Sequence, residues 1–386
     1  MDNNFNHQME LMTKEFRLLL AILRDRDSTN PVNSELFTNI NWKLFIQLVR
    51  HHRVYPLIYL KLKNLDNKVI PSHVIKILYQ DYKNNTYNML QLSVEMELLS
   101  KLFSENRIRI LVLKGPVIAF DIYGDISLRT SKDLDILISL TDLNRAEELL
   151  LNNGYEREKT PVPFKEWKRR KHHLTYFHPK KSIQIEIHWK LHPPPSKEPT
   201  FDDLWERKRI STLTTYPVYF MGKEDLFSYL VSHGARHGWF RLRWLTDIDQ
   251  MIKNGLSIEK INLLLNKYQY QYMGGQALIL ASLLLNTPNP NKVNKLTEKS
   301  RSKKLAKISI KYIINMCEFQ YPKDYLFSLK SNSQKFITIL LLFHPSSADS
   351  ETLKLPKLLH FLYFPLRPFL WTWRKTRKTH KNDYQQ

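Results

Sequence analysis

Three patterns of hydrophobic and polar positions follow one another along this chain of 386 residues. Up to about residue 105 the apolar positions recur every three or four residues, as in the stretch 82–103, which predicts amphipathic helices. From residue 106 short β-branched or aliphatic runs predict strands, and after residue 222 the helical spacing returns. The sequence therefore predicts four regions: an N-terminal helical region (1–105), an α/β core (106–222), a C-terminal helical domain (223–345) and an aromatic and basic tail (346–386).

Within the core, the predicted strands are residues 108–113, 134–138 and 183–188, with one further candidate at 216–221. A helix is predicted at 143–151, because its apolar positions end at Asn152-Asn153-Gly154, a favourable C-terminal stop. The C-terminal domain contains four predicted helices, at 224–237, 242–253, 258–267 and 275–285. The expected fold class is α+β, with a small mixed sheet between N-terminal and C-terminal helical regions.

The turn between the first strand and the helix after it is a candidate anion site. Leu113 leads into Lys114-Gly115-Pro116: glycine lets the backbone approach a ligand closely, and proline suits the first helical position. Free amides and the positive end of the helix dipole would then face an anion, with the charge of Lys114 beside them. Ordinary strand-to-helix turns share these features, so the turn alone does not establish an anion-binding site.

Two of the predicted strands carry carboxylates. Asp133 and Asp135 are two residues apart on one strand, so their side chains emerge on the same face. In the strand 183–188 the isoleucines take one face, and Glu186 and His188 take the other. Converging carboxylates repel each other unless a cation lies between them, and Mg²⁺ prefers oxygen ligands. Together the three carboxylates could form a two-metal site, although a glutamate on the open face of a strand is normally only solvated.

Five motifs occur in order along the chain: Leu113-Lys114-Gly115-Pro116, Tyr123-Gly124-Asp125, Leu128-Arg129, Asp133-Leu134-Asp135-Ile136-Leu137 and Glu186-Ile187-His188-Trp189. In this order they resemble the nucleotidyltransferase superfamily typified by DNA polymerase β. More narrowly, they resemble the bacterial uncharacterised nucleotidyltransferase family that carries Leu-Lys-Gly at the turn. The resemblance covers most of residues 15–250. Two positions depart from the wider superfamily: its Gly-Ser turn is Lys114-Gly115 here, and its third carboxylate, commonly aspartate, is Glu186.

The resemblance implies a polymerase β-like fold and a metal-dependent nucleotidyltransferase. The nucleotide-binding residues would be Lys114, Gly115 and Arg129, and the catalytic residues, which also bind two Mg²⁺ ions, would be Asp133, Asp135 and Glu186. A nucleoside monophosphate would pass from a nucleoside triphosphate to an acceptor hydroxyl, with release of pyrophosphate. The acceptor stays open between a small molecule, a glycan precursor, a protein and RNA.

The candidate residues of an acceptor site are His188, His233, His237 and Asp247. His233 and His237 lie at i and i+4 on a predicted helix, a spacing that can bind zinc. The stretch between them lacks the glutamate of a zincin motif, which favours packing or acceptor contacts over a metal pair. Asp247 lies on the next helix, where it could help to close a cleft against the α/β core.

Two basic features have alternative interpretations. Arg129 could bind phosphate bidentately, or it could form a salt bridge with Asp125 or Asp133. The basic run at 168–173 precedes a probable strand and could bind an acidic acceptor, or it could be an exposed charge run.

Composition bears on partners and location. The formal net charge of +22 favours an anionic partner, although a lysine-rich surface can also be a compositional habit. The one cysteine, Cys317, excludes an internal disulfide and fits a reducing cytoplasm, where we expect the protein. No secretory signal or spanning segment is predicted. The aromatic and basic tail could bind the inner membrane face peripherally, or it could pack across the helical domain.

Two other functions fit some of these features. Asp-x-Asp also holds the metal of sugar nucleotides in many glycosyltransferases, but those enzymes usually begin with their nucleotide-binding strands. Here about a hundred helical residues precede the first strand. A catalytically degenerate transferase, retained as an RNA- or membrane-associated binding protein, would also fit the charge of +22. The complete set of three carboxylates argues against degeneration.

Overall fold

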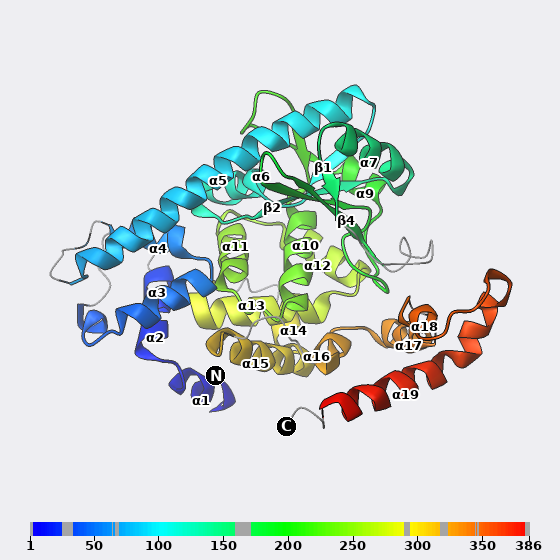
Figure 1. Ribbon diagram of the computed structural model, residues 1–386. Coiled ribbons are helices and arrows are strands. Elements are labelled where there is room, and N and C mark those ends of the chain that lie inside the picture. Colours follow the sequence, from blue (N-terminus) through cyan, green and yellow to red (C-terminus); the bar gives the residue numbers. More distant parts are fainter. Residues whose placement is uncertain are drawn as a thin grey trace.

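A seven-stranded mixed sheet is flanked by helices and lies in the upper part of the view in Figure 1. The computed structural model describes residues 3–24, 34–63, 65, 69–158, 171–288, 294–316, 323–343, 345 and 347–382. The strands are β1 (Ile110–Val112), β2 (Asp133–Ile138), β3 (Glu156–Arg157), β4 (His173–His178), β5 (Ile183–His188), β6 (Arg209–Ser211) and β7 (Val218–Phe220). The α+β class that the sequence predicts is confirmed.

The strands are ordered β3-β4-β5-β2-β1-β7-β6 across the sheet. β2 runs parallel to β5 and antiparallel to β1, while β4 and β5 are antiparallel. The register pairs Asp135 with Glu186, and it sets His173 opposite His188. Because directly paired residues point to the same face of a sheet, the register brings acidic residues and histidines from three strands onto one face.

The opposite face of these strands belongs to the hydrophobic core. Ile183, Ile185 and Ile187 of β5 are buried there, as their alternation with polar residues predicts. The long helix α5 (Ser72–Glu105) packs against β1, β2 and β7 and extends along the upper side of the sheet in Figure 1. Its predicted apolar face is buried and consists of Met89, Leu92, Met96, Leu99 and Phe103.

Helices also occupy both ends of the chain. The N-terminal ones are α1 (Asn3–Glu10), α2 (Lys14–Arg24), α3 (Trp42–His51) and α4 (Tyr55–Leu62). Those of the core are α6 (Pro116–Tyr123), α7 (Leu143–Asn152) and α9 (Phe201–Glu206). After the sheet follow α10 (Lys223–Arg236), α11 (Leu242–Lys253), α12 (Ile258–Lys267), α13 (Gln271–Leu285), α14 (Asn294–Thr297), α15 (Ser300–Ile314) and α16 (Lys323–Ser328). The four helices predicted after residue 222 are therefore present. Cys317 and residues 168–170 of the basic run lie outside the described residues.

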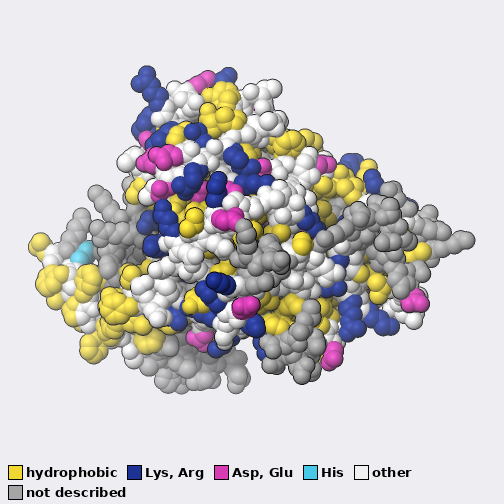
Figure 2. Space-filling model, turned by 180° about the vertical axis from the view of Figure 1, so that it is seen from behind, with side chains coloured by type: hydrophobic (Ala, Val, Ile, Leu, Met, Phe, Trp, Pro, Cys, Tyr) yellow, Lys and Arg dark blue, Asp and Glu magenta, His cyan; other side chains and the backbone are white. Residues whose placement is uncertain are grey.

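The C-terminal segment consists of α17 (Asn332–Leu342), α18 (Ser347–Thr352) and α19 (Tyr363–Asn382). The helix α19 contains two prolines, Pro365 and Pro368, and Pro368 lies in its interior. Pro365 lies in the first turn, where a missing amide hydrogen costs nothing. Figure 2 shows hydrophobic side chains gathered over this segment, at the left of the view. Within the described residues no helix is long and apolar enough to cross a membrane.

Candidate active site

A cavity of about 400 Å³ lies between the polar face of the sheet and the helices α10 and α11. Among the residues that the structure describes, its lining includes seven lysines and arginines and three acidic residues, an excess of four positive charges. The basic residues are Arg53, Lys114, Arg129, Lys132, Arg236, Arg241 and Arg243, and the acidic ones are Asp133, Asp135 and Glu186. Such an imbalance favours the binding of an anion.

The turn after β1 places Lys114 in this cavity. Gly115 has φ 91° and ψ −149°, a conformation that is essentially restricted to glycine, and a Cβ atom there would lie 3.2 Å from Cδ2 of Leu134. Pro116 begins α6, as expected. Gly115 itself is buried and is not among the residues that line the cavity, whereas Lys114 is. The turn therefore presents the lysine rather than the glycine to the cavity.

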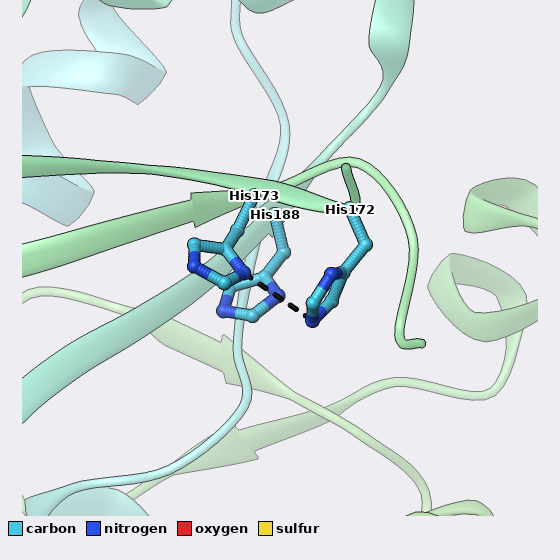
Figure 3. A group of neighbouring side chains, drawn as sticks. All are labelled: His172, His173 and His188. Atoms are coloured by element: carbon cyan, nitrogen blue, oxygen red, sulfur yellow. Dashed lines mark hydrogen bonds between the residues drawn. The ribbon is translucent and has the colours of Figure 1, made fainter. Parts of the chain in front are cut away.

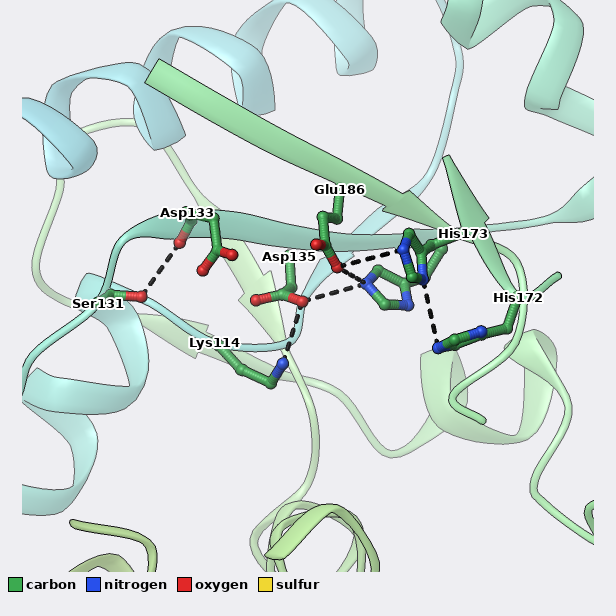
Figure 4. A network of polar contacts seen from close by, with 8 residues as sticks. Lys114, Ser131, Asp133, Asp135, His172, His173 and Glu186 are labelled. Atoms are coloured by element: carbon green, nitrogen blue, oxygen red, sulfur yellow. Dashed lines mark hydrogen bonds and ion pairs between the residues drawn. The ribbon is translucent and has the colours of Figure 1, made fainter. Parts of the chain in front are cut away.

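The three carboxylates point into the cavity from neighbouring strands (Figure 4). Oδ1 of Asp135 accepts a hydrogen bond from Nζ of Lys114 at 3.1 Å and lies 3.1 Å from Nε2 of His188. The same imidazole nitrogen lies 3.2 Å from Oε2 of Glu186. Because both oxygens belong to hydrogen-bond acceptors, Nε2 carries the hydrogen. The structure thus brings Asp135 and Glu186 together, with His188 between them. Asp133 lies two residues before Asp135 on the same face of β2.

These contacts separate the pKa values of the two aspartates. Burial and the nearby charge of Asp135 raise the pKa of Asp133 to about 6. The pKa of Asp135 is lowered in spite of its burial, because Lys114 and His188 stabilise its charge. Burial by itself lowers the pKa of Lys114, but the charges of the carboxylates, Asp135 above all, outweigh it and raise that pKa. The lysine therefore stays charged.

The donor atoms of this cluster fit a divalent cation. One ligand atom each from Asp135, Glu186 and His188 lies within 4.8 Å of the others. Oδ2 of Asp135 is buried and has no hydrogen-bond partner among the described residues, so a ligand atom is available there. Carboxylate oxygens are the ligands that Mg²⁺ prefers. Asp133, Asp135 and Glu186 could therefore hold metal. The side chain of Glu186 is more exposed than that of Asp135.

Arg129 is fully enclosed and forms an ion pair that the sequence did not identify. Its Nε donates to both carboxylate oxygens of Asp247, each at 3.1 Å, rather than to Asp125 or Asp133. Asp125 is engaged elsewhere, because its carboxylate accepts from the amide of Ser127. Nη1 and Nη2 of Arg129 are buried without a partner in the described part of the chain, and the residue lines the cavity. Its guanidinium therefore retains two donor groups for an anion.

A family described as "Uncharacterised nucleotidyltransferase" matches residues 38–286, which include every residue of the cavity lining. The chain belongs to this family. Membership supports nucleotidyl transfer as the general class of reaction, and it implies a nucleotide as a substrate. No curated protein matches the chain.

Three of the four candidate acceptor residues line the cavity. His188, His233 and His237 line it, and the rings of His233 and His237 have centroids 4.5 Å apart. Asp247 does not line it: this side chain is fully buried, accepts from Arg129 and accepts from the hydroxyl of Tyr123 at 3.0 Å. The geometry gives Asp247 a positioning contact with Arg129 in place of a contact with an acceptor.

Several residues of this cavity were not singled out from the sequence. They are Arg53, His192, Tyr229, Arg236 and Arg241, while His172 and His173 were noted only as part of the basic run at 168–173. Burial lowers the pKa of His172 to about 2 and that of His237 to about 3, so these imidazoles are neutral. The available signal was the pair His172-His173 at the start of a strand, which could have been aligned with His188 once the register of β4 and β5 was known.

Proposed function

We propose that this protein is a metal-dependent nucleotidyltransferase, which transfers a nucleoside monophosphate from a nucleoside triphosphate to an acceptor hydroxyl. The observation that carries the proposal is the pairing of Asp135 with Glu186 in register, with Nζ of Lys114 3.1 Å from the aspartate. The catalytic unit would be residues 106–222, between the N-terminal helical region (1–105) and the C-terminal helical domain (223–345).

The basic side chains would bind the triphosphate. Lys114 offers a charged ammonium group beside the carboxylates, and Arg129 offers the two Nη groups that its contact with Asp247 leaves unused. Asp247 would hold that guanidinium in place. Gly115 would act through its backbone conformation, which aims Lys114 at the ligand. Arg243 adds a further charge from α11, where its Nη1 donates to the carbonyl of Thr130.

Asp133, Asp135 and Glu186 would be the residues that hold two Mg²⁺ ions. When bound, these ions would neutralise the triphosphate and lower the pKa of the attacking hydroxyl. The acceptor oxygen would attack the α-phosphorus in line, the bond to the bridging oxygen of the β-phosphate would break, and pyrophosphate would leave. Glu186, 21% exposed, can reach an acceptor and would orient its hydroxyl or accept its proton.

The acceptor would enter from the side of the cavity formed by α10 and the start of α11. His233 and His237 lie on this side, and His188 faces them from the sheet. The acceptor would be a small molecule, a glycan precursor, a protein or RNA. An acceptor with a hydroxyl group and some negative charge suits the surplus of cations in the lining.

Substitution of the aspartates tests the proposal. Asp133→Asn and Asp135→Asn should each reduce transfer of label from α-labelled triphosphate, with Mg²⁺ and cell extract as the source of acceptor, by about 100-fold or more. Asp202→Asn is the matched control, because this carboxylate is exposed on α9 and its ion pair within the described residues is with Arg109 on the surface. Unchanged transfer in both aspartate variants would refute the proposal. Sugar nucleotides offered in parallel separate a glycosyltransferase from a nucleotidyltransferase.

We also propose that the C-terminal segment binds an anionic membrane surface peripherally. Large hydrophobic side chains are exposed along it, among them Phe336, Leu358, Phe361 and Phe369. The end of α19 is rich in lysine and arginine, with no acidic residue from 363 to 382. Exposed aromatic residues beside basic ones suit the interface of an anionic bilayer. Arg367 and Arg374 contribute less, since both form ion pairs with the buried Asp349.

Sedimentation with lipid vesicles tests this second proposal. The full chain should sediment with vesicles that contain phosphatidylserine, and binding should weaken as salt rises. Phe361→Ser combined with Phe369→Ser should weaken binding, while Leu263→Ser, an exposed leucine on α12, should not. Equal sedimentation of the double variant and the unaltered chain would refute the membrane proposal and leave the nucleotidyltransferase proposal untouched.

A further inference from the structure

Three histidines on or next to two adjoining strands cluster together (Figure 3), and they lie beside the carboxylates (Figure 4). His173 begins β4, His172 immediately precedes it, and His188 ends β5. A ring nitrogen from each lies within 4.8 Å of the others. Nδ1 of His173 and Nε2 of His172 lie 3.2 Å apart and share a hydrogen bond (Figure 3), which a metal ion bound to both nitrogens would replace. The nucleotidyltransferase mechanism uses none of these three imidazoles as a metal ligand.

The separation of the nitrogens matches a tetrahedral metal. Zn–N bonds of about 2.0–2.1 Å at a tetrahedral angle place two imidazole nitrogens about 3.3–3.4 Å apart. The 3.2 Å between His172 and His173 is within a few tenths of an ångström of that distance. Three imidazoles also form the ligand set of an open zinc site, in which a fourth position remains for water or substrate.

The sheet fixes two of these ligands. His173 and His188 are direct cross-strand partners, so their side chains leave the backbone on the same face. Their ring centroids are 4.9 Å apart, and that of His172 is 5.5 Å from the centroid of His188. Little rearrangement of the backbone would be needed to bring the three nitrogens onto one ion.

His188 provides an independent indication of a ligand. Its Nε2 faces Asp135 and Glu186, whereas its Nδ1 is buried and has no hydrogen-bond partner within the described residues. The residue is only 3% exposed, so water does not readily satisfy this nitrogen. A carboxylate that accepts from the second nitrogen of a metal-bound imidazole orients the ring and increases its basicity. Asp135 and Glu186 are placed to do this.

We propose that His172, His173 and His188 bind a borderline divalent transition-metal ion, Zn²⁺ in the first instance, at a site distinct from the carboxylate magnesium site. Imidazole ligands favour zinc and its neighbours over Mg²⁺, which prefers oxygen. The site adjoins Glu186 on the side away from Asp133, since β5 runs from Glu186 to His188. A metal there would hold the start of β4 against β5 at the edge of the cavity.

The test uses the full chain without a histidine tag, stripped of metal with a chelator. Zn²⁺ is titrated by calorimetry in excess Mg²⁺, and Co²⁺ is titrated in parallel, because its visible absorption reports tetrahedral coordination. We expect one equivalent of either ion to bind. His172→Ala and His173→Ala should each weaken zinc binding by about 100-fold or more and remove the cobalt spectrum. His73→Ala, an exposed histidine on α5, should change neither.

Asp133→Asn separates this inference from the proposed function. Its carboxylate is not in the histidine group, so zinc affinity should persist in that variant while nucleotidyl transfer is lost. His172 is half-buried and precedes β4, so its substitution should preserve the fold, which circular dichroism checks. Zinc titrations that are identical in the unaltered chain and in both histidine variants would overturn the inference. Zinc binding that is lost in Asp133→Asn and kept in His172→Ala would do the same.

Discussion

Nζ of Lys114 lies 3.1 Å from Oδ1 of Asp135, in a contact that leaves 16% of the lysine side chain and 1% of the aspartate side chain exposed. This ion pair connects the turn after β1, which depends on glycine, with the first half of β2. In a nearly dry environment this pair stabilises the ionised aspartate that a metal would require. It also keeps a cation ready beside the place where phosphate oxygens would bind.

Replacement of that lysine should affect both binding and stability. In Lys114→Met the stem remains but the charge is lost, so Asp135 becomes a buried carboxylate without its cationic partner. We expect the free energy of unfolding to fall by about 2 kcal/mol and the affinity for nucleoside triphosphate to fall by about 10-fold or more. Urea denaturation and equilibrium dialysis measure the two effects. Lys132→Met is the control, since Lys132 lines the same cavity but is exposed; an equal effect there would contradict the special role of Lys114.

The raised pKa of Asp133 predicts a pH dependence of stability in the absence of divalent ions. The folded protein holds a proton on Asp133 up to a pKa of about 6, whereas the unfolded chain releases it near the ordinary value of 3.8. The free energy of unfolding should therefore fall as pH rises from about 4 to about 6, by up to about 3 kcal/mol from this residue.

Asp133→Asn isolates this contribution. The amide cannot ionise, so the variant should become more stable relative to the unaltered chain as pH rises through about 6. Mg²⁺ favours the ionised carboxylate, so it should restore stability in the unaltered chain above that pH and have little effect on the variant. Urea denaturation across the pH range supplies the data. A difference between the two proteins that stays constant with pH would exclude a raised pKa at Asp133.

The ion pair of Arg129 and Asp247 should contribute far more than a surface pair. Each side chain is 1% exposed, so Asp247→Asn would leave an arginine charge buried without compensation. We expect a loss of about 3–5 kcal/mol in the free energy of unfolding. Asp121→Asn breaks a more exposed pair, with Arg209, and should cost about 1 kcal/mol or less. Addition of a nucleoside triphosphate should recover part of the loss in Asp247→Asn if Arg129 binds phosphate, and no recovery would remove that role.

Local sequence patterns determined much of what could be predicted about this fold. The alternation in Ile183–His188 and the apolar face of α5 each depend on neighbours within a few residues, and both are present as predicted. The strand β6 (Arg209–Ser211) was missed because three residues at a sheet edge carry almost no periodic signal. Pairing of Asp135 with Glu186 required a register between strands about fifty residues apart, which the motifs suggested but no local pattern determines.

The parts of the candidate site that sequence could not supply depend on distant contacts. Arg53 follows α3, and Arg241 precedes α11, yet both line the same cavity. The partner of Arg129 lies 118 residues away, so nearby aspartates were the only candidates that the sequence offered. The histidine cluster could not be predicted for the same reason. In the sequence His172 and His173 are part of a basic run, and only the pairing of β4 with β5 brings them close to His188.

Two glycines at the ends of α6 provide a matched test of the turn that presents Lys114. Gly115, at the beginning, has φ 91° and ψ −149°, and an added Cβ would lie 3.2 Å from the side chain of Leu134. Gly124, at the end, has φ 74° in the left-handed region, with no atom within 4 Å of an added Cβ. Gly124→Ala should cost about 1 kcal/mol, the usual penalty for alanine in that conformation. Gly115→Ala should cost about 2–3 kcal/mol, because the backbone region is nearly closed to alanine and Leu134 must move.

Gly115→Ala should also weaken triphosphate binding, since the displaced turn carries Lys114, whereas Gly124→Ala should not. Urea denaturation and nucleotide binding compare the two variants, and equal effects of both would mean that the turn before α6 has no special part in presenting the lysine.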